Sequence, residues 1–104
     1  MAKNYQGAGL QRSFIAPTGG VVGGVPVALG SLVVVPLEDA VKGQPFTGIL
    51  GGSWTLPITG ALKVGTKVGL LAGGLVADGT ADAVPFGKLL SDAAGGFAEA
   101  LLIQ

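Results

Sequence analysis

The sequence predicts an all-β fold, a small single-domain β-barrel or sandwich of about nine short strands. Three observations support this. The 20 glycines and 6 prolines interrupt every stretch long enough for a stable helix. The segments between them are strand-length runs rich in valine, leucine, isoleucine and phenylalanine. In the clearest segments, large apolar side chains recur at every second position, which is the period of a strand with one buried face.

The expected elements follow one another with short connections. Only the segment around Leu37 to Val41 leaves room for a short helical turn. A chain of 104 residues has room for one core, so residues 11–104 are expected to form one domain after an N-terminal arm at residues 1–10. The expected strands are Gln11–Ala16, Val25–Leu29, Ser31–Val35, Pro45–Leu50, Ser53–Ile58, Lys67–Ala72, Leu75–Ala77, Val84–Leu90 and Phe97–Ile103.

Glycine-containing pairs mark several of the connections. Gly73-Gly74 separates two apolar runs, and both residues can adopt the positive φ of a two-residue hairpin turn. Gly51-Gly52 repeats this arrangement before Trp54 and predicts a second hairpin. Lys42-Gly43 and Asp78-Gly79 predict further turns.

The alternation of apolar residues predicts how the core is built. Phe46, Trp54, Leu56 and Ile58 are expected to face one common core. An interface anchor is the alternative role for Trp54, because tryptophan is enriched at binding hot spots. The strand Ser31–Val35 is apolar on both faces, which predicts cover by the core on one side, with a neighbouring subunit as a candidate for the other.

The composition points to contact with other protein chains. The chain is 49% hydrophobic and only 12% charged, with a mean hydropathy of +0.68, whereas an ordinary domain is about 25% charged. One thin core cannot absorb this apolar excess, and large exposed apolar patches are rare on monomers. The alternative is that alanine and glycine, which bury little area each, supply much of the excess at the surface.

Charge argues against nucleic-acid partners, and prolines and glycines argue against a membrane span. The net charge is zero, and the basic residues are spread singly, so no stripe exists to neutralise phosphates. The uncharged stretch from Ser13 to Leu37 has the length of a membrane span, but its prolines and glycines would break a helix. The N-terminus lacks the apolar run of a signal peptide, so synthesis in a cytoplasm is expected.

The usual equipment of an enzyme or a metal site is missing. The sequence has no histidine and no cysteine, so the commonest general bases, nucleophile partners and zinc ligands are absent. Glu38-Asp39 and the pair Asp78 and Asp82 are interpreted as polar turns. The segment from Gly60 to Lys67 has the spacing of a phosphate-binding P-loop with its last two residues reversed, and it is interpreted as a turn entering a strand. No catalytic, metal or cofactor residues are predicted.

The order of these features resembles a family of tailed-phage virion proteins, the small capsid decoration or cement proteins. The similarity extends over nearly the whole chain. It departs from the family pattern at Thr66, Gly69 and Glu99. The matching segments are Lys3-Asn4-Tyr5, Ala16-Pro17, Gly24-Val25-Pro26-Val27, Gly30-Ser31-Leu32-Val33-Val34, Ala40-Val41-Lys42-Gly43-Gln44, Gly48, Trp54-Thr55-Leu56-Pro57, Val64-Gly65-Thr66-Lys67-Val68 and Phe86-Gly87.

The resemblance implies a structural virion protein without enzyme activity. It would decorate the outer surface of an icosahedral head and bridge major capsid protein subunits, assembling with itself as a homotrimer or, alternatively, a dimer. The alternative function is a small β-barrel module that binds a ligand or another protein; a ligand-binding barrel would need an internal cavity. The expected interface residues are Lys3, Asn4, Tyr5, Leu32, Val34, Leu101 and Ile103.

Overall fold

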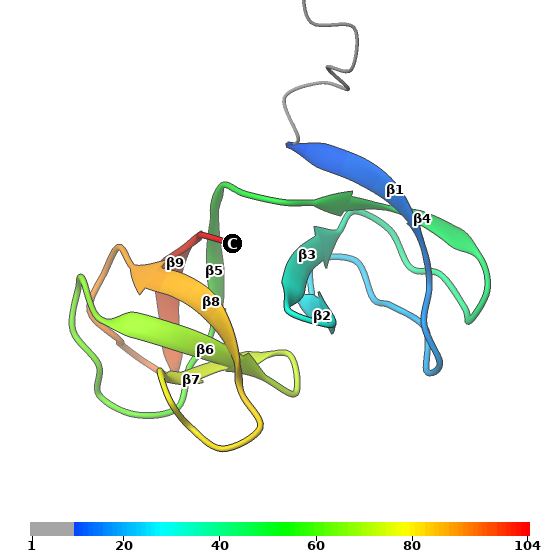
Figure 1. Cartoon of the computed structure of the whole chain (residues 1–104). Coiled ribbons are helices and arrows are strands. Elements are labelled where there is room, and N and C mark those ends of the chain that lie inside the picture. The colour runs from blue at the N-terminus through cyan, green and yellow to red at the C-terminus, as the bar shows by residue number, and fades with distance from the viewer. Residues whose placement is uncertain (1–9) are drawn as a thin grey trace, which may run out of the picture.

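The computed structural model describes residues 10–104, in which it contains nine β-strands and no helix (Figure 1). The all-β prediction is therefore confirmed. Each expected strand is present, and the largest shift is at β2, which begins at Val27 instead of Val25. The expected helical turn after Leu37 is wrong, because Ala40 instead forms a bridge with Val21. The strands are β1 (Gln11–Ile15), β2 (Val27–Leu29), β3 (Leu32–Pro36), β4 (Pro45–Ile49), β5 (Ser53–Pro57), β6 (Lys67–Leu71), β7 (Gly74–Ala77), β8 (Val84–Leu89) and β9 (Phe97–Leu102).

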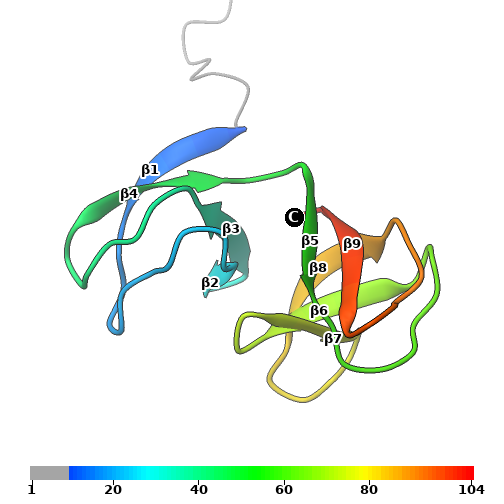
Figure 2. The same cartoon turned by 180° about the vertical axis from the view of Figure 1, so that it is seen from behind.

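The strands form two antiparallel sheets that divide the chain in sequence order. The first sheet has the order β1-β4-β3-β2 and the second has the order β5-β9-β8-β6-β7. Figures 1 and 2 show the sheets side by side, with the chain crossing from one to the other between β4 and β5. The second sheet is curled but not closed, since β5 and β7 meet only at the parallel bridge between Ile58 and Leu75.

Two of the predicted hairpin turns differ from the structure. The β6–β7 turn is formed by Ala72 and Gly73, with φ of 51° and 82°, one residue earlier than the glycine pair suggested. Gly51-Gly52 is no hairpin at all, because β4 pairs with β1 and β3 while β5 pairs with β9. A glycine pair permits a sharp change of direction, and here the chain uses it to leave one sheet for the other.

Strand β3 is buried on both faces by its own chain. Val33, Val34 and Val35 are each 0% exposed. Val33 and Val35 belong to the larger apolar cluster, which lies mainly in the second sheet, whereas Val34 belongs to a smaller cluster on the other side of the first sheet. Successive side chains of a strand point to opposite faces, so β3 contributes to both clusters. A neighbouring subunit is not needed to cover this strand.

The predicted common core of Phe46, Trp54, Leu56 and Ile58 is wrong. Phe46 lies in the smaller cluster, and Leu56 and Ile58 lie in the larger one. Trp54 is half-buried at the margin of the larger cluster, and its indole N–H donates to the carbonyl of Gly51 at 3.0 Å. The crossover between the sheets separates the two halves of a pattern that looks continuous in the sequence.

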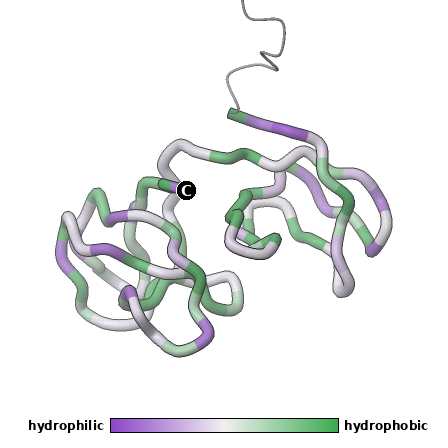
Figure 3. The backbone as a smooth tube through the Cα atoms, viewed as in Figure 1, coloured by the Kyte–Doolittle hydropathy of each residue, from purple (hydrophilic) through white to green (hydrophobic). Residues whose placement is uncertain are grey.

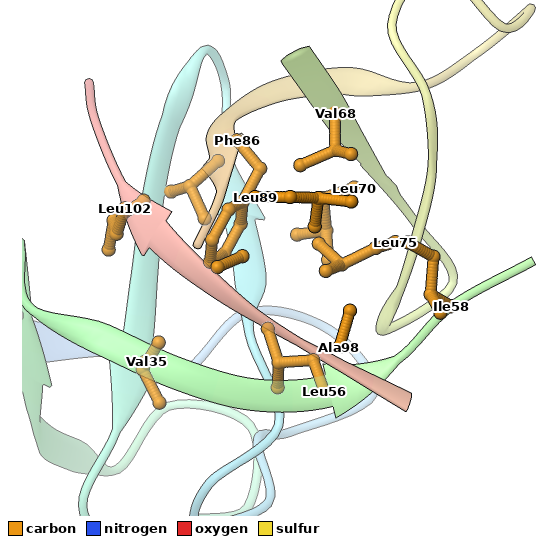
Figure 4. Packing of buried hydrophobic residues seen from close by; sticks show 12 residues of the cluster. Val35, Leu56, Ile58, Val68, Leu70, Leu75, Phe86, Leu89, Ala98 and Leu102 are labelled. Carbon is orange, nitrogen blue, oxygen red and sulfur yellow. The ribbon is translucent and has the colours of Figure 1, made fainter. Parts of the chain in front are cut away.

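The larger cluster is centred on strand β8. Phe86 and Leu89 are almost completely buried, and Figure 4 shows them among side chains from β6, β7 and β9, with Val35 of β3 at one side. Gly87, between them, approaches strand β9 very closely. A Cβ atom at Gly87 would overlap the carbonyl oxygen of Leu101, so only glycine fits at this crossing.

Gln104 ties the end of the second sheet to the first. The ladder between β3 and β4 ends at Val35, because β4 turns away toward β5. Beyond that point the Gln104 side chain bonds to the backbone of β3 where β4 no longer does. Its Nε2 donates to the Val33 carbonyl at 2.6 Å, and its Oε1 accepts from the Val33 N–H at 3.1 Å. A further bond runs from Nε2 to the Leu50 carbonyl at 3.0 Å. A side-chain amide thus replaces a missing strand partner.

Replacing Gly87 by alanine is expected to lower the free energy of unfolding by about 2–3 kcal/mol, because β8 and β9 must separate to admit the methyl group. Gly51→Ala is the matched control, since Gly51 does not have a positive φ and a Cβ there meets nothing within 4 Å. Its effect should stay within about 0.5 kcal/mol. Denaturant unfolding measures the free energy of unfolding of both variants. Equally small losses for Gly87→Ala and Gly51→Ala would contradict the close approach of Gly87 to strand β9.

Gln104→Glu is expected to lower the free energy of unfolding by about 1–3 kcal/mol, because a carboxylate cannot donate to the carbonyls of Val33 and Leu50. Gln44→Glu is the control, because the Gln44 amide acts there only as an acceptor, from the Val41 N–H at 3.4 Å. Chemical denaturation of both variants tests this. A control that loses as much stability as Gln104→Glu would show that the hydrogen bonds at Gln104 are not the cause.

Candidate interaction surface

No chemical site is assembled in the described part of the chain. Every buried side chain there is apolar, and no three carboxylates come together in a group that could hold a metal ion. Three exposed carboxylates instead accept hydrogen bonds from backbone amides of other segments, namely strand β4 and two loops. Glu38 accepts from Thr47 at 2.6 Å, Asp39 from Gly23 at 2.8 Å, and Asp92 from Val64 at 2.8 Å. The interpretation of Glu38-Asp39 as a polar turn holds, and the bonds across to other segments are what the sequence did not reveal.

The segment that resembles a P-loop is a turn that leads into a strand. The N–H of Thr66 donates to the carbonyl of Lys63 at 3.1 Å, and β6 begins at the next residue. The N–H of Gly65 and the carbonyl of Thr66 bond to Leu89, so the loop packs on β8. Gly69, one of the departures from the family pattern, lies at an irregularity of the β6–β8 pairing, while the β6–β7 hairpin stays regular.

Two hollows lie at the surface of residues 10–104. One, of about 410 Å³, lies between the loop containing Gly19 to Val22 and the turn from Asp39 to Gln44. The other, of about 340 Å³, lies beside Lys67, Lys88 and Ile103. Both are open depressions, so they give no support to the internal cavity that a ligand-binding barrel would need.

The outer face of the second sheet carries exposed apolar side chains. Along β9, Phe97, Glu99 and Leu101 alternate with the buried residues Ala98, Ala100 and Leu102. The partner strand β5 places Pro57 opposite Phe97, Thr55 opposite Glu99 and Ser53 opposite Leu101. Phe97 is 52% exposed. We call the surface formed by Ser53, Thr55, Pro57, Phe97, Glu99 and Leu101 the β5–β9 face.

The predicted interface residues fall into three groups. Leu101 is half-buried on the β5–β9 face, and Ile103 follows β9 with 44% of its surface exposed. Leu32 is half-buried against the smaller cluster. Val34 is fully buried inside the chain, so its side chain cannot contact a partner. The prediction that Val34 lies at an interface is therefore wrong. Lys3, Asn4 and Tyr5 lie outside the described residues.

The sequence reasoning passed over the two most prominent apolar residues of the β5–β9 face, Phe97 and Pro57. The signal was present in the run from Phe97 to Leu102, where large residues at Phe97 and Leu101 alternate with small ones at Ala98 and Ala100. This pattern suggests that the large residues are the buried ones. In the structure the small residues Ala98 and Ala100 face the core instead, and Phe97 and Leu101 lie on the outer face.

Strand β1 is the second exposed feature. Gln11, Arg12, Ser13 and Ile15 are all exposed, and only Phe14 is half-buried. The Phe14 ring packs on Phe46 with ring centroids 5.9 Å apart. Figure 3 shows hydrophilic residues along the first half of this strand, next to the N-terminal end of the described chain.

Residues 10–104 contain no helix of the length and apolarity needed to cross a membrane.

A chain with apolar faces and no assembled chemical centre is typical of a protein that works by contact. The family model for phage cement proteins matches residues 6–103, which is nearly the whole sequence. The chain belongs to the phage cement protein family. This confirms the resemblance inferred from the order of its motifs, and it makes the cement protein a structural component of a phage capsid. No curated protein and no solved structure matches the chain.

Proposed function

We propose that this cement protein decorates the outer surface of an icosahedral phage head as a homotrimer and stabilises the head by bridging neighbouring major capsid protein subunits. Membership of the family supports the capsid role. The observation that supports the finer proposal is the β5–β9 face, where Phe97 is 52% exposed beside Pro57 and Leu101 and nothing else in residues 10–104 covers it. In this proposal the protein is made in the host cytoplasm and joins the head after folding.

Bridging stabilises a shell by mass action. A protein that binds only the assembled lattice lowers the free energy of that state and leaves the separated subunits unaffected. This role needs shape, apolar surface and backbone contacts, and it needs no catalytic group. The described residues of the chain offer these features.

Self-association would use the β5–β9 face. Phe97 and Leu101 supply apolar area, Ile103 adds to it just beyond β9, and Glu99 is the charged residue of β5 and β9. A homotrimer covers such faces around one axis and leaves the opposite end of each subunit free. A dimer formed through the same face is the alternative.

Contact with the capsid would use the N-terminal segment Lys3–Arg12. It is more polar than the uncharged stretch that follows it, and it continues into the exposed strand β1. In this proposal the segment reaches a neighbouring subunit or the capsid lattice.

Phe97→Ser tests the self-association surface. Phe97 is about half exposed in the single chain, so the substitution should leave the fold intact while shifting the mass from trimer toward monomer. Light scattering measures the mass, and Val41→Ser is the control, since Val41 is 65% exposed in the loop between β3 and β4, away from this face. A trimer that survives Phe97→Ser unchanged would exclude this face, and a dimer in the unsubstituted protein would correct the symmetry.

Deletion of residues 2–9 tests the capsid contact. The shortened protein should keep its thermal unfolding temperature and its number of subunits. It should lose binding to undecorated heads in a cosedimentation assay. If binding survives the deletion, the body of the domain makes the contact. If a monodisperse monomer of the full chain shows no affinity for undecorated heads, the decoration function itself is contradicted.

A further inference from the structure

Strand β1 is the least protected strand edge in the described part of the chain. It has one neighbour, β4, and its other edge is open. The remaining edges are blunted: β2 has only three residues, β5 ends in Pro57, and β7 meets the chain after β5 at the Ile58–Leu75 bridge. Strand β1 has five residues with no proline and no recorded register shift. Exposed edges of this kind promote pairing with other chains, so proteins normally protect them.

The register identifies the backbone groups at the open edge. The carbonyl of Leu10 accepts from Leu50, and the N–H of Ala16 donates to Gln44. Even-numbered residues of β1 therefore bond to β4, and the odd-numbered residues Gln11, Ser13 and Ile15 direct their N–H and C=O groups outward. The open edge presents these groups on alternate residues, as a strand partner requires.

The charge near this edge is positive and unpaired within residues 10–104. Arg12 is exposed and has no carboxylate within ion-pair distance there. Glu38 and Asp39, the acidic residues of the loop that joins β3 to β4, are each hydrogen-bonded to a backbone amide. A partner segment with an acidic side chain near Arg12 would complement this charge.

We propose that the open edge of β1 accepts an extended segment of the major capsid protein as a fifth strand of the first sheet. This inference rests on the proposed function, and it names the surface that holds the capsid. The segment would be extended, would carry no proline at the positions that face β1, and would place an acidic residue near Arg12. Main-chain hydrogen bonds would supply affinity, and the side chains of β1 would set the register.

A second copy of the chain is the rival occupant of this edge. Pairing of β1 with the same strand of another copy would be isologous, with Ser13 opposite its own equivalent, and would generate a two-fold axis. The proposed homotrimer has no such axis, so the edge remains available to the capsid lattice.

Ser13→Pro tests the proposal. Proline is tolerated where the N–H points away from the sheet, so the β1–β4 ladder should survive, whereas the ring removes an outward donor and obstructs an incoming strand. Ala77→Pro is the matched control: Ala77 is exposed in edge strand β7, and the bond from Asp78 to Lys67 places the Ala77 N–H outward. Binding of each full-length variant to undecorated heads is measured by cosedimentation, beside thermal unfolding and light scattering.

The expected result is at least about a tenfold loss of affinity for Ser13→Pro and no loss for Ala77→Pro, with both variants folded and trimeric. If the unsubstituted protein binds heads and Ser13→Pro binds equally well, the strand proposal fails while the decoration function stands. If Ser13→Pro lowers the mass of the free protein, a second copy occupies the edge and the proposal is overturned. If the unsubstituted protein does not bind heads, the proposed function fails.

A second pair of variants applies if Ser13→Pro does not fold. Arg12→Glu reverses an exposed charge without touching the ladder, and Lys42→Glu reverses another exposed charge at the β3–β4 turn. Affinity for heads should fall about tenfold for Arg12→Glu, and the salt dependence of binding should weaken. Equal binding by the two variants would overturn the proposal.

Discussion

The two-sided burial of β3 holds this molecule together. Val33 and Val35 fill one side of the strand and Val34 fills the other, and all three are completely excluded from solvent. Each such side chain contributes about 1.5–3 kcal/mol through burial. Residues 10–104 pass between the sheets once, through Gly51-Gly52. The contact of β3 with the second sheet and the hydrogen bonds of Gln104 therefore fix how the sheets sit together.

This arrangement places the apolar surplus of the composition in two locations. Part of it is buried inside the chain, where β3 contributes side chains to both apolar clusters. This burial explains how a chain with so few charged residues can form a folded domain. The remainder lies at Phe97 on the β5–β9 face, at Ile15 of β1 and Leu71 of β6, and on loop residues. The two proposed contacts therefore come from different sheets, with self-association on the second and the capsid on the first. A bridging protein needs such separation, because the surface that joins copies must not compete with the surface that holds the lattice.

The sequence predicted the local structure well and the long-range structure poorly. Strand positions follow from glycine and proline spacing and from runs of β-branched residues, which act locally, and the nine strands were found within a few residues of their bounds. The division into sheets depends on which strands pair, and Gly51-Gly52 permits a hairpin and a crossover equally. The cover of Val34 and the role of Gln104 depend on residues distant in sequence, which no local pattern encodes. Of the candidate interaction surface, Leu101 and Ile103 could be inferred from an apolar run, whereas Phe97 could not, because the alternation of large and small residues in β9 suggests that Phe97 is buried.

A cryo-electron microscopy map of heads carrying this protein is the most direct test of the account. If the protein bridges the shell, the map will contain density for the domain on the outer surface, with three copies joined through their β5–β9 faces. It also predicts that each first sheet is extended by a strand of the major capsid protein along β1. Density elsewhere in the virion, or a single copy that contacts only one capsid subunit, would contradict the claim that the protein bridges the shell.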